Sequence, residues 1–130
     1  MKKVSIILLC AMIVVSAFAS SIAESKSVQY TYIAMITAGL TINGGTATVS
    51  GSVMPKRNYR TSVTVNLQIE LNDGTWSTVA TWSGSNNAGY SEAGGTESVL
   101  SGESYRTYVI GYVYNSTGVV IDSATAYYYY

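Results

Sequence analysis

Between Ser62 and Leu71, every second side chain is apolar and the intervening side chains are polar. The apolar members of this stretch are Val63, Val65, Leu67, Ile69 and Leu71. Because successive side chains of a β-strand point to opposite faces, the alternation predicts a strand with one buried and one solvated face. Asn72-Asp73-Gly74 follows, and these residue types tolerate a positive φ. The chain is therefore predicted to turn there and to return as a partner strand over Thr75 to Ser83.

The remainder of the chain beyond residue 23 repeats this combination of alternating stretches and turn residues, without a helical period. Further strands are predicted over Val28 to Ile42, Thr46 to Met54, Tyr90 to Leu100, Ser104 to Asn115 and Val119 to Tyr130. Gly39 is expected to bend or bulge the first of these strands, and Gly94-Gly95 to interrupt the one that begins at Tyr90. The predicted loops and turns are Asn43-Gly44-Gly45, Pro55 to Arg60, Gly84 to Gly89 and Ser116-Thr117-Gly118.

About seven short antiparallel strands at this spacing predict an all-β, immunoglobulin/fibronectin-like sandwich of two sheets, with a small barrel as the main rival. Tyr105 favours the sandwich, because it begins the penultimate strand just after a turn that contains Gly102. This is the position of the tyrosine corner in such sandwiches, although an ordinary packed aromatic residue would also suit it. The Cys…Trp…Cys pattern of antibody domains is absent, so an antibody-type core is not expected.

Residues 1–23 have the pattern of a secretory signal peptide. Lys2 and Lys3 precede the uncharged apolar stretch Val4 to Val15, and small residues follow, with cleavage expected after Ala19 or Ala23. A membrane-spanning helix needs about 20 apolar residues, so the alternative of an uncleaved anchor is less favoured. The prediction is a secreted, extracellular protein whose single domain occupies residues 24–130 and has no membrane contact after cleavage.

The composition excludes several classes of function. The sequence has no His and one Cys, Cys10, which lies in the predicted signal peptide. A histidine base, a Ser-His-Asp triad, an internal disulfide and a thiolate metal site are therefore excluded. Removing Lys2 and Lys3 leaves five cations against seven carboxylates, a net charge of −2, which is unsuited to nucleic acid. The carboxylates stand singly in turns and on solvated strand faces, so we predict no enzyme, no cofactor and no metal site.

The arrangement of several segments resembles a family of small exported proteins of Gram-positive bacteria. These segments are the signal peptide, Tyr30-Thr31-Tyr32-Ile33, the hairpin from Leu67 to Leu71 with Trp76-Ser77-Thr78-Val79 and Trp82, and Tyr105-Arg106. Proteins of that family carry an immunoglobulin-like domain of unknown function. The resemblance implies export and a sandwich fold, and it implies no catalytic or binding residues.

Eight of the twelve tyrosines lie between Tyr105 and Tyr130. If Tyr105 points inward with Val109, Gly111 and Val113, then Arg106, Tyr108, Ile110, Tyr112 and Tyr114 point outward together. Two of the tyrosines from Tyr127 to Tyr130 should project from each face of the last strand. Trp76 and Trp82, six residues apart, share a face of a regular strand, but Val79 between them then points away. Either a bulge intervenes or the tryptophans are partly exposed.

Two explanations of the outward aromatic residues remain open. They can form a structural cross-strand ladder, or they can form a face that binds a protein or a glycan. The predicted binding residues are Arg106, Tyr108, Tyr112, Tyr114, Trp76 and Trp82. The alternative function is a structural or self-assembling cell-surface protein, because the final strand has no charge after Asp122 and would offer an edge to another copy.

Overall fold

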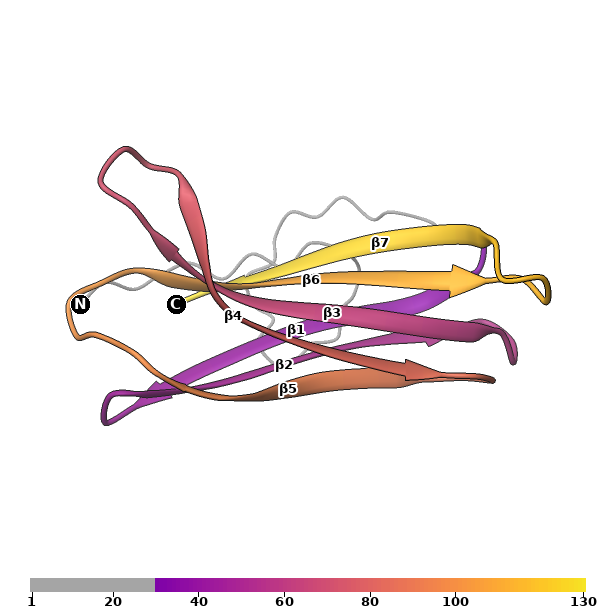
Figure 1. Cartoon of the computed structure of the whole chain (residues 1–130), viewed down its shortest axis with the longest axis horizontal. Coiled ribbons are helices and arrows are strands. Elements are labelled where there is room, and N and C mark those ends of the chain that lie inside the picture. The colour runs from indigo at the N-terminus through magenta and orange to yellow at the C-terminus, as the bar shows by residue number, and fades with distance from the viewer. Residues whose placement is uncertain (1–29) are drawn as a thin grey trace.

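The computed structural model describes residues 30–130, which form seven antiparallel β-strands (Figure 1). The strands are β1 (Ile33–Asn43), β2 (Thr46–Pro55), β3 (Arg60–Glu70), β4 (Trp76–Asn86), β5 (Ser91–Ser98), β6 (Tyr105–Tyr114) and β7 (Val120–Tyr129). The predicted signal peptide, residues 1–23, and the first two residues of the predicted first strand lie outside the described residues. No helix long and apolar enough to cross a membrane occurs in residues 30–130.

The strands form two sheets, a three-stranded sheet with the order β1-β2-β5 and a four-stranded sheet with the order β4-β3-β6-β7. The two sheets pack face to face, as Figure 1 shows, and strand pairing does not close them into a barrel in the described part of the chain. The predicted immunoglobulin/fibronectin-like sandwich is therefore confirmed. In immunoglobulin constant domains the fourth strand joins the sheet of the first, second and fifth strands, whereas here β4 pairs with β3.

The alternation of β3 produces the predicted burial over most of its length. Val63, Val65 and Leu67 are buried against the other sheet, but Ile69 is only half-buried and Leu71 is exposed beyond the end of the strand. Inward residues of both sheets fill the core. Its buried apolar members are Ile33, Ile36, Ala38, Leu40, Ala47, Val49, Val53, Val63, Val65, Leu67, Tyr105, Val109, Val113, Ala124 and Ala126.

Two glycine predictions were wrong, and the packing explains why. β1 continues through Gly39, which pairs with Ser50, and the bulge of this strand lies between Ile33 and Met35 instead. β5 likewise continues through Gly94-Gly95. A side chain at Gly94 would collide with the backbone carbonyl of Val49, so glycine permits close strand approach there and does not interrupt pairing.

The loop boundaries differ from the prediction where tertiary pairing extends the strands. Pro55 ends β2 and Arg60 begins β3, so the predicted loop Pro55 to Arg60 is shorter. β4 continues to Asn86, inside the predicted loop Gly84 to Gly89, because it pairs with β3 as far as Thr61. The hairpin turn predicted over Asn43-Gly44-Gly45 is confirmed, but it comprises only Gly44 and Gly45, because Asn43 still pairs with Thr46 as the last residue of β1. Both glycines have a positive φ, 58° and 83°, as a tight hairpin turn requires.

Tyr105 forms the predicted tyrosine corner. Its side chain is only 3% exposed. The backbone N–H of Leu100 donates a hydrogen bond of 2.9 Å to its hydroxyl. The loop between β5 and β6 is thus attached to the first residue of β6, which confirms the interpretation of Tyr105 as a corner residue and not merely a packed aromatic.

Tyr105→Phe should lower the free energy of unfolding by about 1–2 kcal/mol, because the N–H of Leu100 would lose its partner in a partly buried position. Urea denaturation followed by tryptophan fluorescence would measure the change. Tyr112→Phe is the matched control, since its half-buried ring lies on the outer face, and we expect a change below about 0.5 kcal/mol. Equal losses in the two variants would contradict a corner role for the Tyr105 hydroxyl.

Candidate functional site

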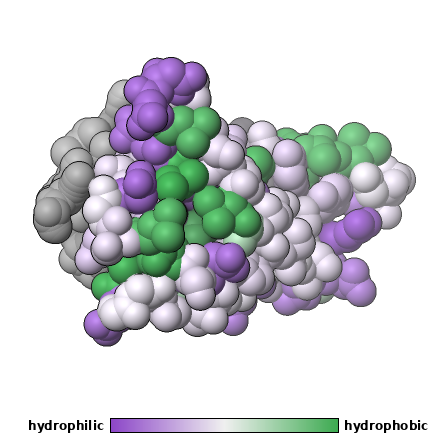
Figure 2. Space-filling view, turned by 60° about the vertical axis from the view of Figure 1, so that its left-hand side comes forward, coloured by the Kyte–Doolittle hydropathy of each residue, from purple (hydrophilic) through white to green (hydrophobic). Residues whose placement is uncertain are grey.

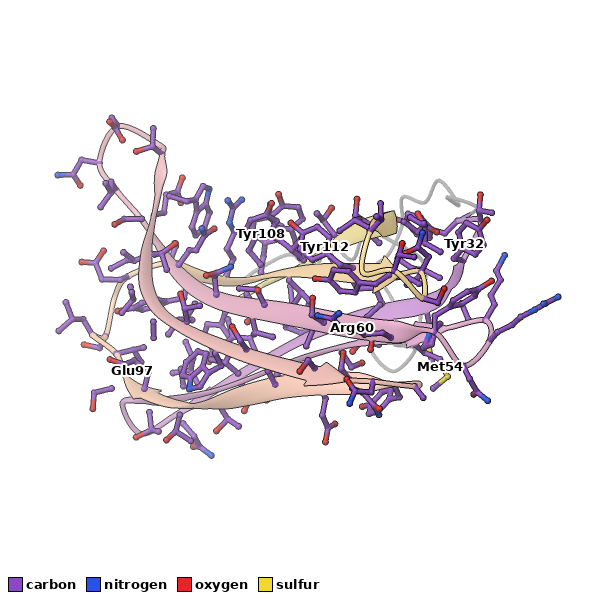
Figure 3. The ribbon with its side chains drawn as sticks, turned by 45° about the vertical axis from the view of Figure 1, so that its right-hand side comes forward. Tyr32, Met54, Arg60, Glu97, Tyr108 and Tyr112 are labelled. Carbon is purple, nitrogen blue, oxygen red and sulfur yellow. The ribbon has the colours of Figure 1, made fainter. Side chains whose placement is uncertain are left out.

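The outer face of the β4-β3-β6-β7 sheet carries the aromatic residues predicted from the alternation of β6. Tyr105, Thr107, Val109, Gly111 and Val113 are buried, whereas the residues between them are half-buried on the opposite face. Tyr108 and Tyr112 project from the same side of β6 in Figure 3. The predicted outward register of Arg106, Tyr108, Ile110, Tyr112 and Tyr114 is confirmed.

The register between β6 and β7 decides which of the terminal tyrosines join this face. Arg106 pairs with Tyr129 and Tyr108 pairs with Tyr127, so these tyrosines share the outer face. Tyr128 pairs with the buried Thr107 and packs against the core. The backbone N–H of Tyr130 donates a 3.0 Å hydrogen bond to the carbonyl of Tyr105, which fixes this register at the end of the strand.

Arg106 lies at the centre of an aromatic group at this end of the sheet. Its guanidinium carbon is 4.4 Å from the ring centroid of Trp76 and 4.7 Å from that of Tyr127. The rings of Tyr129 and Tyr108 follow at 5.7 Å and 5.9 Å. Distances of this size are those of cation–π contacts, so several rings stabilise one charge.

Two neutral side chains orient the guanidinium. The Nε of Arg106 donates a 2.7 Å hydrogen bond to Oε1 of Gln68, and Nη1 donates a 3.1 Å bond to the hydroxyl of Tyr129. Gln68 is itself held by a 3.1 Å bond from its Nε2 to the hydroxyl of Thr78 on β4. Within residues 30–130, the hydrogen bonds and contacts of Arg106 involve no carboxylate. Its positive charge is therefore held in place without a counter-ion from this part of the chain.

The rings also pack on one another. Tyr108 and Tyr127 are stacked with centroids 4.7 Å apart and planes 10° apart. Tyr127 stacks on Tyr129 at 6.0 Å, and Trp76 meets Tyr129 edge-on at 5.8 Å. Burial raises the pKa of the Tyr127 hydroxyl above its ordinary value, and Tyr108 raises it further, while Arg106 acts in the opposite direction. We call Gln68, Trp76, Arg106, Tyr108, Tyr127 and Tyr129 the Arg106 cluster.

Tyr112 and Tyr114 form a separate group further along the same face. Their centroids are 6.4 Å apart, and the guanidinium of Arg60 lies 4.6 Å from the ring of Tyr114. The hydroxyls of Tyr114 and Ser62 are hydrogen-bonded at 2.7 Å. The aromatic residues predicted to point outward are thus divided into two groups, each of which contains an arginine.

Trp82 does not join either cluster, although the sequence placed it with Trp76. In the pairing of β3 with β4, Leu67 faces Ala80 and Gln68 faces Thr78, so Val79 is an extra residue in β4. This bulge moves the two tryptophans to opposite faces of the sheet. Trp76 contacts Arg106 on the outer face, whereas Trp82 pairs with the buried Val65 and packs against the core. A bulge was one of the two alternatives that the sequence left open.

Sequence reasoning missed Gln68 as a member of the cluster and did not say which terminal tyrosines face outward. Gln68 is the polar residue of β3 that pairs with Arg106, so a correct strand order would have identified it. No group of three or more metal-ligating side chains occurs in residues 30–130. No protein-family model, no curated protein and no solved structure matches this chain.

Proposed function

We propose that this chain is a secreted, non-catalytic binding domain that recognises a protein partner through the Arg106 cluster. The observation that carries the proposal is a guanidinium that lies 4.4 Å and 4.7 Å from the ring centroids of Trp76 and Tyr127 and whose hydrogen bonds within residues 30–130 go to neutral side chains. Trp, Tyr and Arg are the residue types in which the binding energy of protein interfaces concentrates. A cluster built from these three types on a solvent-facing sheet therefore suits an interface.

The stacking of the rings favours a protein partner over a glycan. A sugar ring binds by lying flat on a free aromatic face. The faces of Tyr108 and Tyr127 are turned toward each other, and Tyr127 also stacks on Tyr129. Stacking therefore occupies ring faces that a sugar would need, whereas ring edges and hydroxyls can still hydrogen-bond and make apolar contacts with side chains of another protein.

The charge of Arg106 indicates an acidic group on the partner. A guanidinium has five N–H donors in a planar fork, and Gln68 and Tyr129 occupy only part of this capacity. A carboxylate can accept two parallel hydrogen bonds from such a fork. Because Arg106 is half-buried among these rings, the ion pair would be screened less than one between two free surface side chains.

Support for export and against catalysis comes from the sequence. The charged and apolar segments of residues 1–23 are typical of a signal peptide, which also agrees with the resemblance to exported Gram-positive proteins. The absence of His from the whole chain removes the commonest general base. The proposal therefore assigns the cluster to recognition, with an extracellular location.

Selection of a random peptide library against residues 24–130 tests the proposal, because the two sheets lie entirely within this range. We expect enriched peptides that combine an acidic residue with an apolar neighbour. Arg106→Ala should weaken their binding by about thirtyfold or more, which corresponds to a loss of about 2 kcal/mol at an interface hot spot. Isothermal calorimetry with one synthetic peptide would measure the change.

Arg57→Ala is the matched control, because Arg57 is an exposed arginine in the loop between β2 and β3 and should leave the affinity unchanged. A glycan array probed with the same two variants would separate the alternative. Glycan binding that depends on Arg106, with no peptide selected, would contradict the protein partner. Equal losses of affinity in Arg57→Ala and Arg106→Ala would mean that binding depends only on the net charge of the domain. That result would contradict a binding site at the Arg106 cluster.

A further inference from the structure

The hairpin formed by the end of β3 and the start of β4 projects from one end of the sandwich (Figure 1). The backbone of β4 forms one edge of the four-stranded sheet, and its side chains from Ser77 to Val79 are all exposed. Further along, β4 runs beside β5, where a side chain at Gly84 would collide with the carbonyl of Glu92. Among residues 30–130, the part of this edge that no other strand covers is therefore confined to the projecting hairpin.

The hydrogen-bond pattern shows which backbone groups point out of the open edge. The N–H of Leu71 donates a 2.7 Å bond to the carbonyl of Thr75 at the turn, so these two residues are a hydrogen-bonded pair. Bonding alternates along an antiparallel ladder. Trp76 and Glu70 consequently exchange no backbone hydrogen bonds, and neither do Thr78 and Gln68. The N–H and C=O groups of Trp76 and Thr78 therefore point away from β3, toward the free side of the edge.

This short edge is complementary to itself. A second copy placed antiparallel beside it can pair its Thr78 with Trp76 of the first copy, and its Trp76 with Thr78. Each pairing exchanges both N–H···O bonds, and Ser77 then faces its own counterpart on the two-fold axis. Since the paired segments are in the projecting hairpins, the two sandwiches extend in opposite directions and do not obstruct each other.

Charge and exposed apolar surface favour a second copy as the occupant. No charged residue occurs between Asp73 and Glu92, so the strand meets no like charge across a two-fold axis. Leu71 and Val79 in the same hairpin are 47% and 41% exposed. The end of the molecule that carries this hairpin shows apolar side chains gathered below a polar tip (Figure 2). Pairing of two hairpins would cover part of this apolar surface.

We propose that the protein forms a symmetric dimer by antiparallel pairing of β4 edges along Trp76–Thr78. The expected self-association through the C-terminal strand is less suited, because β7 begins beside β1, where Asp122 accepts a 2.7 Å hydrogen bond from the N–H of Tyr32. The two-fold axis of the proposed dimer is perpendicular to the joined sheets. The Arg106 clusters of both copies therefore lie on the same side, as one bivalent surface.

Disulfide trapping tests the position of the axis, because residues 24–130 contain no cysteine. Non-bonded antiparallel pairs bring Cα atoms within the range that a disulfide requires. Ser77→Cys should form a covalent dimer under mild oxidation, detected by non-reducing electrophoresis. Ser83→Cys is the control, since Ser83 is also exposed on β4 but lies in the part of the strand beside β5. Equal yields of covalent dimer from the two variants would overturn the pairing.

A charge exchange tests the same contact without oxidation. In sedimentation experiments at increasing concentration, Ser77→Lys alone and Ser77→Glu alone should dimerise about tenfold less than the unchanged chain, because like charges meet on the axis. An equimolar mixture of the two variants should recover the dimer. A dimer that survives both variants but disappears when Tyr127 to Tyr130 are deleted would place the contact on β7 and overturn the proposal, as would a strict monomer of the unchanged chain.

Discussion

Gly51→Val should leave the protein largely unfolded, because the two sheets touch across this glycine. A Cβ atom at Gly51 of β2 would lie 2.6 Å from Cγ2 of Val109 and 2.7 Å from Cγ2 of Val65. Both valines are completely buried in the facing sheet, so neither can move toward solvent. Overpacking a core commonly costs about 1–3 kcal/mol, and a valine adds three carbon atoms where not even one fits. We expect a loss above about 3 kcal/mol, a large part of the stability of such a domain.

Gly51→Ala gives a milder variant whose unfolding can be measured, with an expected loss of about 1–3 kcal/mol in urea denaturation. Gly39→Ala is the matched control on the neighbouring strand. There the added methyl group would meet only the hydroxyl oxygen of Ser50 at 2.7 Å, and that side chain can rotate away. We expect its stability to change by less than about 1 kcal/mol. Similar losses at both positions would contradict the close contact of the sheets at Gly51.

Strand faces could be predicted where alternation is uninterrupted. On β6, the positions of Tyr105, Arg106 and Tyr108 followed from a period of two, and the structure confirms all three. The tyrosine corner was also predictable, because Tyr105 follows a turn that contains glycine. In such sandwiches a tyrosine at this position attaches the preceding loop to the strand through its hydroxyl. The alternation along β6 was sufficient for these residues, because pairing with the neighbouring strands keeps each side chain on the face that the alternation predicts.

Bulges in the strands could not be predicted from the alternation of side chains. Residue Ile121 is skipped in the pairing of β6 with β7, because Tyr114 pairs with Val120 but Val113 pairs with Asp122. Without this shift, each later side chain of β7 would lie on the opposite face of the sheet. Tyr128, rather than Tyr127 and Tyr129, would then join the Arg106 cluster. Nothing in the local composition distinguishes Ile121 as a bulge. Which of the terminal tyrosines belong to the Arg106 cluster therefore depends on how β6 and β7 pair along their whole length.

The bulge at Val79 has the same effect on the tryptophans, and it assigns them different roles. Trp76 remains on the outer face against Arg106, while Trp82 closes the sandwich at the side where β4 adjoins β5. A side chain at Gly95 of β5 would collide with Nε1 of the Trp82 indole. Gly95 therefore provides the space that this ring occupies, which also explains a glycine in the middle of a continuous strand.

Trp82→Ala should lower the free energy of unfolding by about 2–3 kcal/mol, because a half-buried aromatic ring is removed from the edge of the core. Gly95→Ala alone should cost about 1–2 kcal/mol, since its methyl group collides with the indole. In the Trp82→Ala background the collision is absent, and Gly95→Ala should then be neutral or stabilising.

The double-mutant cycle should thus give a coupling energy of about 1–2 kcal/mol, obtained from urea denaturation of the four proteins. Trp76→Ala combined with Gly95→Ala is the matched control, because Trp76 lies on the opposite face of the sheet and its effect should simply add to that of Gly95→Ala. Additive effects for Trp82 and Gly95 would mean that the two residues do not touch. Coupling of Trp76 with Gly95 would place that tryptophan inside the sandwich, and the Arg106 cluster would then lose the ring on which its geometry depends.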